Sequence, residues 1–106
     1  MFKLIFFVPK DNVEQVKNAI FEVGAGRIGN YAQCSWQTEG IGQFRPLDGA
    51  KPSIGNKGNL EVVPEFRVEI LCLDSNIQAA IDAMKQTHPY EEPAFEVISL
   101  QNHRFN

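Results

Sequence analysis

The order of the expected elements constrains the fold of this chain more than any other feature. Residues 2–8 form an almost continuously apolar run with three phenylalanines, and residues 30–38, 65–72 and 94–100 also have the patterns of strands. Amphipathic helical stretches separate the first strand from the second and the third from the fourth. The order βαβ–βαβ predicts an α+β, ferredoxin-like βαββαβ sandwich, with both helices on one face of an antiparallel sheet.

Both expected helices carry sequence signals for their ends. Each has the spacing of a capping box at its start, Asp11 with Glu14 and Ser75 with Gln78. Gly24 is placed to end the first helix in a left-handed conformation, and His88-Pro89 ends the second.

The connection between the second and third expected strands is the least regular part of the chain. Residues 39–59 hold five of the eight glycines together with Pro46 and Pro52. Such a length without periodicity is typical of a functional loop or of disorder. Four apolar side chains favour an ordered excursion with a short hairpin near Gly42–Pro46: Ile41, Phe44, Leu47 and Ile54.

Composition excludes several classes of protein. The 106 residues have room for one domain, which we take to span residues 1–106 and to end in a tail at residues 101–106. A net charge of −3 argues against nucleic-acid binding, and no apolar run reaches the roughly 20 residues that a membrane span needs. Two cysteines, Cys34 and Cys72, make no disulfide framework, so we expect a cytoplasmic protein.

Two motifs are best interpreted as structural. The glycines of residues 24–29 match G-x-G-x-x-G, which binds a pyrophosphate where a strand precedes it and a helix follows. Here a helix precedes and a strand follows, so we interpret the motif as a helix end and a tight turn and expect no nucleotide cofactor. Cys34 and Cys72 lie on the expected inner faces of strands, which favours core packing over metal binding.

The densest polar cluster is His88–Pro93, with the sequence HPYEEP. One interpretation is a rigid turn that presents imidazole and carboxylate groups to a ligand or a divalent cation. The other is a turn that positions the last strand and pairs its charges across a subunit contact. Phe44, Arg45 and Asp48 allow a similar pair of interpretations, a ligand clamp in which Arg45 holds an anion or an ion pair that fastens the loop. No Ser-His-Asp or Cys-His arrangement makes a case for catalysis.

Two blocks of sequence resemble known families. The run HPYEEP before a strand resembles the HPYE-x-P signature of CutA, the divalent-cation-tolerance family, whose trimeric ferredoxin-like fold is related to the PII signalling proteins. Gly24–Trp36, Gly42–Gly55 and His88–Ala94 together look like the YqfO-type domain, which is inserted into longer, Nif-three-like dinuclear-metal hexameric proteins. This second match is the nearer one and runs over nearly the whole chain.

The resemblance implies a free-standing version of the inserted domain, without the dinuclear metal site and hydrolase chemistry of the flanking domain. From CutA it implies a trimeric habit and an affinity for divalent metals. The residues that match the CutA signature are His88, Pro89, Tyr90, Glu91 and Pro93. Glu92 departs from it, because CutA tends to have an apolar residue there, and the glycine-rich loop is foreign to CutA.

We therefore expect a non-enzymatic, homo-oligomeric module that binds a small ligand or a divalent metal, with a trimer favoured over a dimer. The expected ligand-binding residues are Phe44, Arg45, Tyr90 and Glu92, and the expected metal-binding residues are His88 and Glu91. A subunit that docks on a larger protein is one alternative. A small metal-dependent enzyme, with Cys34 or Glu92 in the chemistry, is a less favoured one.

Overall fold

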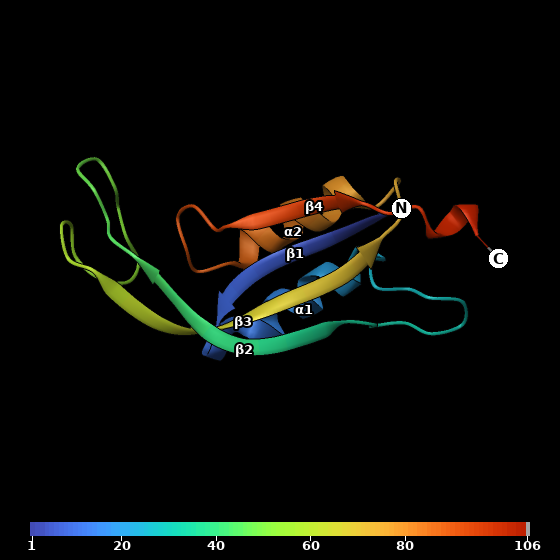
Figure 1. Ribbon diagram of the computed structural model, residues 1–106, viewed down its shortest axis with the longest axis horizontal. Coiled ribbons are helices and arrows are strands. Elements are labelled where there is room, and N and C mark those ends of the chain that lie inside the picture. Colours follow the sequence, from blue (N-terminus) through green and yellow to red (C-terminus); the bar gives the residue numbers. More distant parts are fainter. Residues whose placement is uncertain (106) are drawn as a thin grey trace.

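The computed structural model describes residues 1–105 and shows two helices packed on one face of a four-stranded antiparallel sheet (Figure 1). In chain order the elements are β1 (Phe2–Pro9), the 3-10 turn η1 (Lys10–Asn12), α1 (Val13–Glu22), β2 (Trp36–Phe44), β3 (Glu61–Cys72), α2 (Ile77–Thr87), β4 (Phe95–Ser99) and the 3-10 turn η2 (Asn102–Arg104). The strand order is β2-β3-β1-β4. The predicted βαββαβ sandwich is confirmed.

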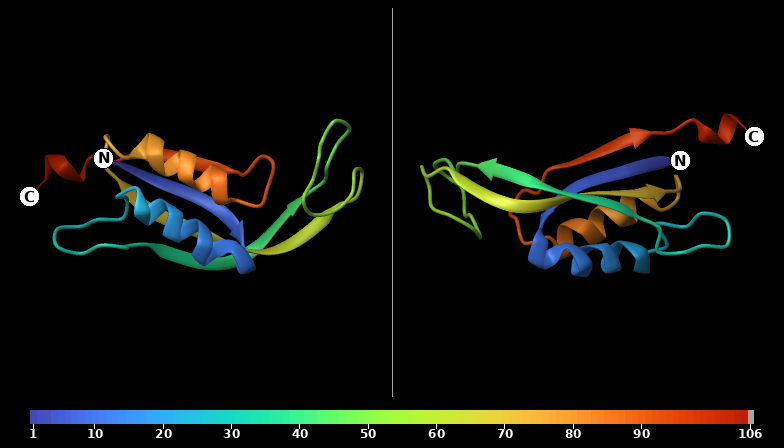
Figure 2. Two further views of the ribbon diagram at one scale, coloured as in Figure 1. Left: turned by 180° about the vertical axis from the view of Figure 1, so that it is seen from behind. Right: turned by 60° about the horizontal axis from the view of Figure 1, so that its bottom comes forward.

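The core fills the space between the helices and the covered face of the sheet, and the other face is open (Figure 2). The side chains that alternate along β1 and β3 toward the helices are fully or almost fully buried: Leu4, Phe6, Val8, Val68, Ile70 and Cys72. They meet an apolar stripe on each helix, including Val16 and Ile20 of α1 and Met84 of α2. This packing explains why the helical and strand periodicities of the sequence identify the core.

The helix ends follow the predictions only in part. Gly24 follows α1 with φ +95°, as a left-handed residue after a helix should, and α2 ends at Thr87 before His88-Pro89. Neither capping box forms, because the N-caps are Asn12 and Asn76 and neither donates or accepts a side-chain cap bond. The turn η1 leads directly into α1, and the Asn76 amide instead donates to the Gly24 carbonyl at 3.1 Å.

The second strand begins later than the sequence pattern predicted. The prediction of a strand over 30–38 is wrong for residues 30–35, which form a loop in which Gln33 has φ 58°. Gly40 and Gly42, whose low strand propensity indicated a loop, lie inside β2. Pairing with β3 outweighs that propensity, since strand preference depends strongly on tertiary context.

The irregular excursion is correspondingly shorter than predicted. β2 continues to Phe44 and β3 begins at Glu61, so the connection spans residues 45–60 rather than 39–59. The prediction of a short hairpin near Gly42–Pro46 is also wrong, because Gly42–Phe44 is the last part of strand β2.

The hairpin formed by β2 and β3 extends beyond the rest of the sheet. β1 pairs with β3 only as far as Pro9 opposite Glu65, so residues 41–44 and 61–64 pair with each other alone. We call these residues and the connecting loop 45–60 the arm. Figure 1 shows the arm curving away from the body of the molecule, whose longest extent is 50 Å. Pro64 lies in this part of β3, where one neighbour is missing and a residue without an N–H is tolerated.

The segment between α1 and β2 confirms the structural interpretation of the glycine motif. Gly26 has φ +76°, and a Cβ there would lie 2.9 Å from the Cys34 carbonyl oxygen, so only glycine fits. Ile28 and Tyr31 form an isolated bridge around a tight turn. Cys72 is buried in β3 as predicted, whereas Cys34 lies in this loop and is only half-buried, so its prediction as a core strand residue is wrong.

The tail leaves the body beside the N-terminus and forms η2 (Figure 1). Phe105 is exposed, and Asn106, the last residue of the predicted tail, lies outside the described residues. Within residues 1–105 no helix combines the length and apolar character required to cross a membrane.

Candidate functional site

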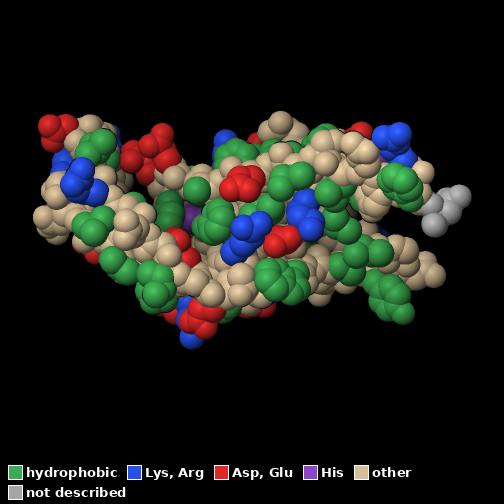
Figure 3. Space-filling view, viewed as in Figure 1, with side chains coloured by type: hydrophobic (Ala, Val, Ile, Leu, Met, Phe, Trp, Pro, Cys, Tyr) green, Lys and Arg blue, Asp and Glu red, His purple; other side chains and the backbone are tan. Residues whose placement is uncertain are grey.

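A cavity of about 300 Å³ lies between the arm and the turn that connects α2 to β4. Figure 3 shows the hollow between the arm and the body, with acidic side chains beside it. The lining residues come from β1, from the arm and its neighbouring strand residues, and from the turn: Phe7, Gly42, Gln43, Phe44, Arg45, Pro46, Ala50, Pro52, Ser53, Ile54, Glu65, Tyr90, Glu91, Glu92 and Ala94. Most of this wall is apolar, with a few polar groups, as in many small-molecule sites.

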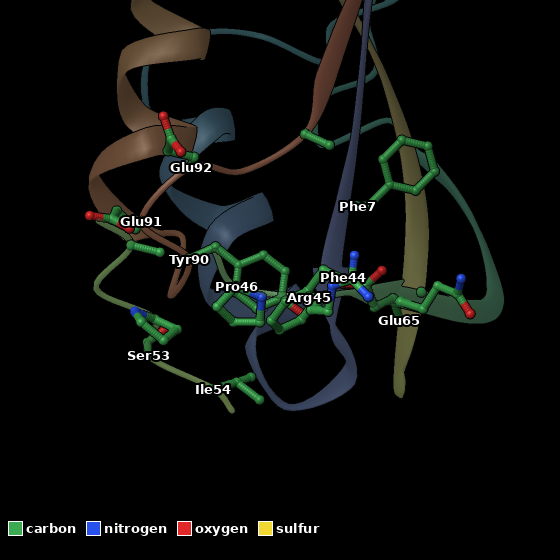
Figure 4. A pocket seen from close by; sticks show the side chains of 15 residues that line it. Phe7, Phe44, Arg45, Pro46, Ser53, Ile54, Glu65, Tyr90, Glu91 and Glu92 are labelled. Carbon is green, nitrogen blue, oxygen red and sulfur yellow. The ribbon is translucent and has the colours of Figure 1, made fainter. Parts of the chain in front are cut away.

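Tyr90 is the central side chain of the cavity, between Glu91 and Glu92 on one side and Glu65 on the other (Figure 4). Its ring meets Phe44 edge-on, with the ring centroids 5.6 Å apart. Its hydroxyl donates a hydrogen bond to Glu65 Oε2 at 2.7 Å. Burial, followed by this bond and the charge of Glu65, raises the pKa of the Tyr90 phenol, which therefore stays neutral.

His88 supports Tyr90 from behind rather than lining the cavity. The Tyr90 backbone N–H donates to His88 Nδ1 at 3.1 Å, and the two rings lie 4.9 Å apart. Nε2 therefore carries the proton and donates to the Phe7 carbonyl at 2.7 Å. Burial lowers the pKa of His88, so the buried imidazole is neutral near pH 7.

Glu65 occupies space that a glycine leaves open. A Cβ at Gly42 would overlap the Glu65 carboxylate, so a larger residue at this position would displace it. Glu65 is half-buried, and among residues 1–105 no salt bridge involves it. Its partner in the described part of the chain is the neutral Tyr90 hydroxyl.

The loop of the arm is fastened to the α2–β4 turn by two hydrogen bonds. The Lys51 N–H donates to Glu91 Oε1 at 3.0 Å, and the Ser53 hydroxyl donates to the Pro89 carbonyl at 2.6 Å. Within the loop, the Gly58 N–H donates to the Pro46 carbonyl at 2.7 Å. These bonds close one end of the cavity and hold the loop in an ordered conformation.

The structure brings together the residues predicted from two distant segments of the sequence. Phe44, Arg45, Tyr90 and Glu92, the expected ligand-binding residues, all line the cavity. Asp48, which was considered as part of the clamp, does not line it.

Sequence reasoning missed Glu65, whereas Gly42 and Ser53 lie in the Gly42–Gly55 segment that it expected to contribute to the site without naming them as ligand-binding residues. In the sequence, Glu65 is one of several acidic residues in an expected strand, and nothing distinguishes it. Only the strand register, which places Gly40 opposite Glu65, shows that Glu65 lies beside the arm. Gly42 is a signal that the sequence does contain, because a glycine inside a strand often marks a place where another group approaches the backbone closely.

The predicted metal pair of His88 and Glu91 stays a prediction. Both ring nitrogens of His88 already have hydrogen-bond partners, and Glu91 accepts the Lys51 N–H. A cation on His88 would have to displace one of these bonds. Within the described part of the chain, no group of three or more His, Cys, Asp or Glu side chains is arranged to hold a metal ion.

The fold is that of a ferredoxin-like domain, as in the CutA proteins. CutA1 from Pyrococcus horikoshii superposes with a TM-score of 0.67 over 94% of this chain and 83% of its own, at 16% identity, which supports the fold alone. No model of a known protein family matches the chain.

The sequence relationship lies with the YqfO/NIF3-type proteins. The chain is 48% identical over 99 residues to the GTP cyclohydrolase 1 type 2 homolog of Bacillus subtilis, covering 93% of this chain and 26% of that protein. A Bacillus cereus protein related to NIF3 has 40% identity and a TM-score of 0.81, over 95% of this chain and 26% of its own. The chain thus spans about a quarter of the length of the curated relatives it matches. The predicted resemblance is confirmed, and it concerns one segment of these longer proteins.

Proposed function

We propose that this chain is a non-enzymatic, homo-oligomeric module that binds a small ligand in the cavity between the arm and the α2–β4 turn. The observation that carries this proposal is the cavity itself. It joins an aromatic wall, Phe44 and Tyr90, to charged groups from two distant segments of the chain. Concave, mostly apolar surfaces with a few convergent polar groups are the usual form of small-molecule sites.

The chemistry of the lining groups and of the other reactive side chains supports binding rather than catalysis. The Ser53 hydroxyl donates to a backbone carbonyl and has no neighbouring base to activate it among its described contacts. The Tyr90 phenol has a raised pKa, and His88 uses both ring nitrogens in structural bonds. Burial raises the pKa of the Cys72 thiol to about 11, far from the value of a reactive thiolate.

We also propose that the protein is cytoplasmic, because both cysteines are free, as is usual in a reducing compartment.

The arm supports assembly with further copies of the chain. A two-stranded hairpin is marginally stable in water by itself. One face of the arm forms the cavity wall, and the opposite face exposes Ile41 and Val62, with exposed fractions of 80% and 59%. Neighbouring copies that pack on this face would cover it and the free edge of β2. We favour a trimer, with a dimer as the alternative.

The relatives favour a second candidate function, a subunit that docks on a larger protein. These relatives are about four times as long as the segment matched here, since the match covers 26% of their length. Their name refers to GTP cyclohydrolase, an activity that we do not assign to this segment. The docking function predicts that a partner protects exposed loops, including residues 45–60, from protease.

Native mass spectrometry of the protein as purified, without added metal or chelator, tests the proposal. We expect an oligomer that retains a bound small mass. A double variant, His88→Ala with Glu91→Ala, separates metal from ligand: loss of a retained metal ion would support the predicted metal pair, and undiminished retention would contradict it. A monomer without any bound mass would overturn the proposed module and favour the docking subunit.

A further inference from the structure

The charges around the cavity are unbalanced. Among the described residues that line it, three carry carboxylates, Glu65, Glu91 and Glu92, and one carries a permanent positive charge, Arg45. Glu91, Glu92 and Arg45 are exposed at the rim, whereas Glu65 is half-buried next to the aromatic wall. A ligand that enters therefore meets an excess of negative charge.

Glu65 is the carboxylate that we expect to attract the positive charge of a ligand. Its Oε2 accepts the Tyr90 hydroxyl, and the missing side chain of Gly42 leaves room for its carboxylate. A carboxylate that is partly removed from water and lacks a cationic partner costs free energy, and a cation brought by a ligand reduces that cost. Apolar walls strengthen this attraction, because they lower the local dielectric constant.

The aromatic side chains also favour a positively charged ligand. Tyr90 and Phe44 present ring surfaces that attract cations through their quadrupoles, and Phe7 lies on the same cavity. Rings and carboxylates around one hollow form the usual environment for an organic ammonium group. The volume of about 300 Å³ is at the small end of the range for ligand pockets, which suits one ring or one branched side chain.

We propose that the cavity takes a small organic cation, an ammonium or amidinium group joined to an aromatic or branched apolar group. This inference rests on the proposed function and names the chemical class of the ligand. The charged head lies toward Glu65 and the acidic rim, and the apolar part packs against Phe44 and Tyr90.

A pair of probes with the same ring and opposite charge tests the class. Phenethylammonium and 3-phenylpropionate are titrated into the isotopically labelled full chain, and amide shifts are followed by NMR. We expect the amine to shift signals of cavity residues such as Phe44, Ser53 and Tyr90, and to bind at least about tenfold tighter than the acid. Added salt should narrow the difference at the exposed rim.

A pair of matched variants identifies the carboxylate that attracts the amine. Glu65→Gln keeps the shape and an oxygen that accepts the Tyr90 hydroxyl but removes the charge, and we expect it to weaken amine binding at least about fivefold. Glu96→Gln removes one charge from exposed β4, at a residue that does not line the cavity, and should change the affinity by less than about twofold. Glu92→Gln at the rim provides a second test if the Glu65 variant folds poorly.

The outcomes separate this inference from the function on which it rests. Tighter binding of 3-phenylpropionate at the same residues would overturn the cationic class and leave the binding module standing. Equal effects of Glu65→Gln and Glu96→Gln would also overturn it, because the preference would then reflect total charge. No shift of cavity signals with either probe up to about 10 mM would count against both the class and the cavity as a ligand site.

Discussion

At the scale of single residues, three side chains hold the cavity wall in place. Neutral His88 receives the Tyr90 N–H and donates to the Phe7 carbonyl, and the Tyr90 hydroxyl donates to Glu65. Two of these bonds connect His88 to Glu65 through Tyr90. A protonated imidazole has no lone pair at Nδ1 to accept the Tyr90 N–H.

This geometry predicts an acid-sensitive contribution to stability. Burial lowers the pKa of His88 in the folded chain, so the unfolded chain binds the proton first as the pH falls below about 6.5. The contribution is complete above that pH and is lost toward the lower pKa of the folded state, by at most about 1.4 kcal/mol per pH unit. Urea unfolding at about pH 7.5 and pH 5.5 measures this loss.

The variant His88→Gln should show a smaller loss between these two pH values than the parent chain. His103→Gln, in the exposed turn η2, is the matched control and should keep the full loss. If the His88→Gln chain loses as much stability between the two pH values as the parent chain, the loss does not come from the His88 imidazole. It would then be attributed to the carboxylates.

At the scale of elements, strand β2 contains two glycines with opposite surroundings. A Cβ at Gly42 would overlap the Glu65 carboxylate, whereas a Cβ at Gly40 would have nothing within 4 Å. A side chain at position 42 therefore requires the Glu65 carboxylate to move, whereas a side chain at position 40 does not. Both lie in extended backbone that alanine adopts freely, so the comparison isolates the effect of space.

We expect Gly42→Ala to displace the Glu65 carboxylate and destabilise the chain by about 1 kcal/mol, because the Tyr90 hydroxyl loses its partner. Gly40→Ala should be neutral or stabilising by about 0.5 kcal/mol, since it reduces the freedom of the unfolded chain. Thermal and urea unfolding of the two variants measure both effects. Equal stabilities would refute the steric role of position 42.

The elements also show how far the sequence could be interpreted. Continuous or alternating apolar runs identified β1, most of β3 and β4, because their burial against the helices produces that pattern. β2 was misplaced, since Gly40 and Gly42 lower strand propensity and only pairing with β3 explains their conformation. Both sides of the cavity were found from Phe44, Arg45 and the HPYEEP turn. Glu65 was missed, because its role depends on a register that no local pattern specifies.

At the scale of the whole molecule, the arm is the feature that predicts assembly. Its outer face exposes Ile41 and Val62, which lie on one side of the hairpin and away from the cavity. We expect the double variant Ile41→Lys with Val62→Lys to shift the mass measured by light scattering toward that of one chain, with the circular dichroism spectrum unchanged. Ile98→Lys on β4 is a control at the opposite edge of the sheet. An unchanged mass in the arm variant would exclude this face from the interface.

The arm has two faces and only two strands, so successive residue pairs in it point alternately toward the cavity and toward the outer surface. If copies associate through the outer face, occupancy of the cavity and association are linked equilibria. Binding of a ligand multiplies the association constant of the copies by some factor. By reciprocity, association of the copies multiplies the affinity for that ligand by the same factor. The affinity then depends on the concentration of the protein itself, and a dilution series becomes a measurement of the coupling between the two faces.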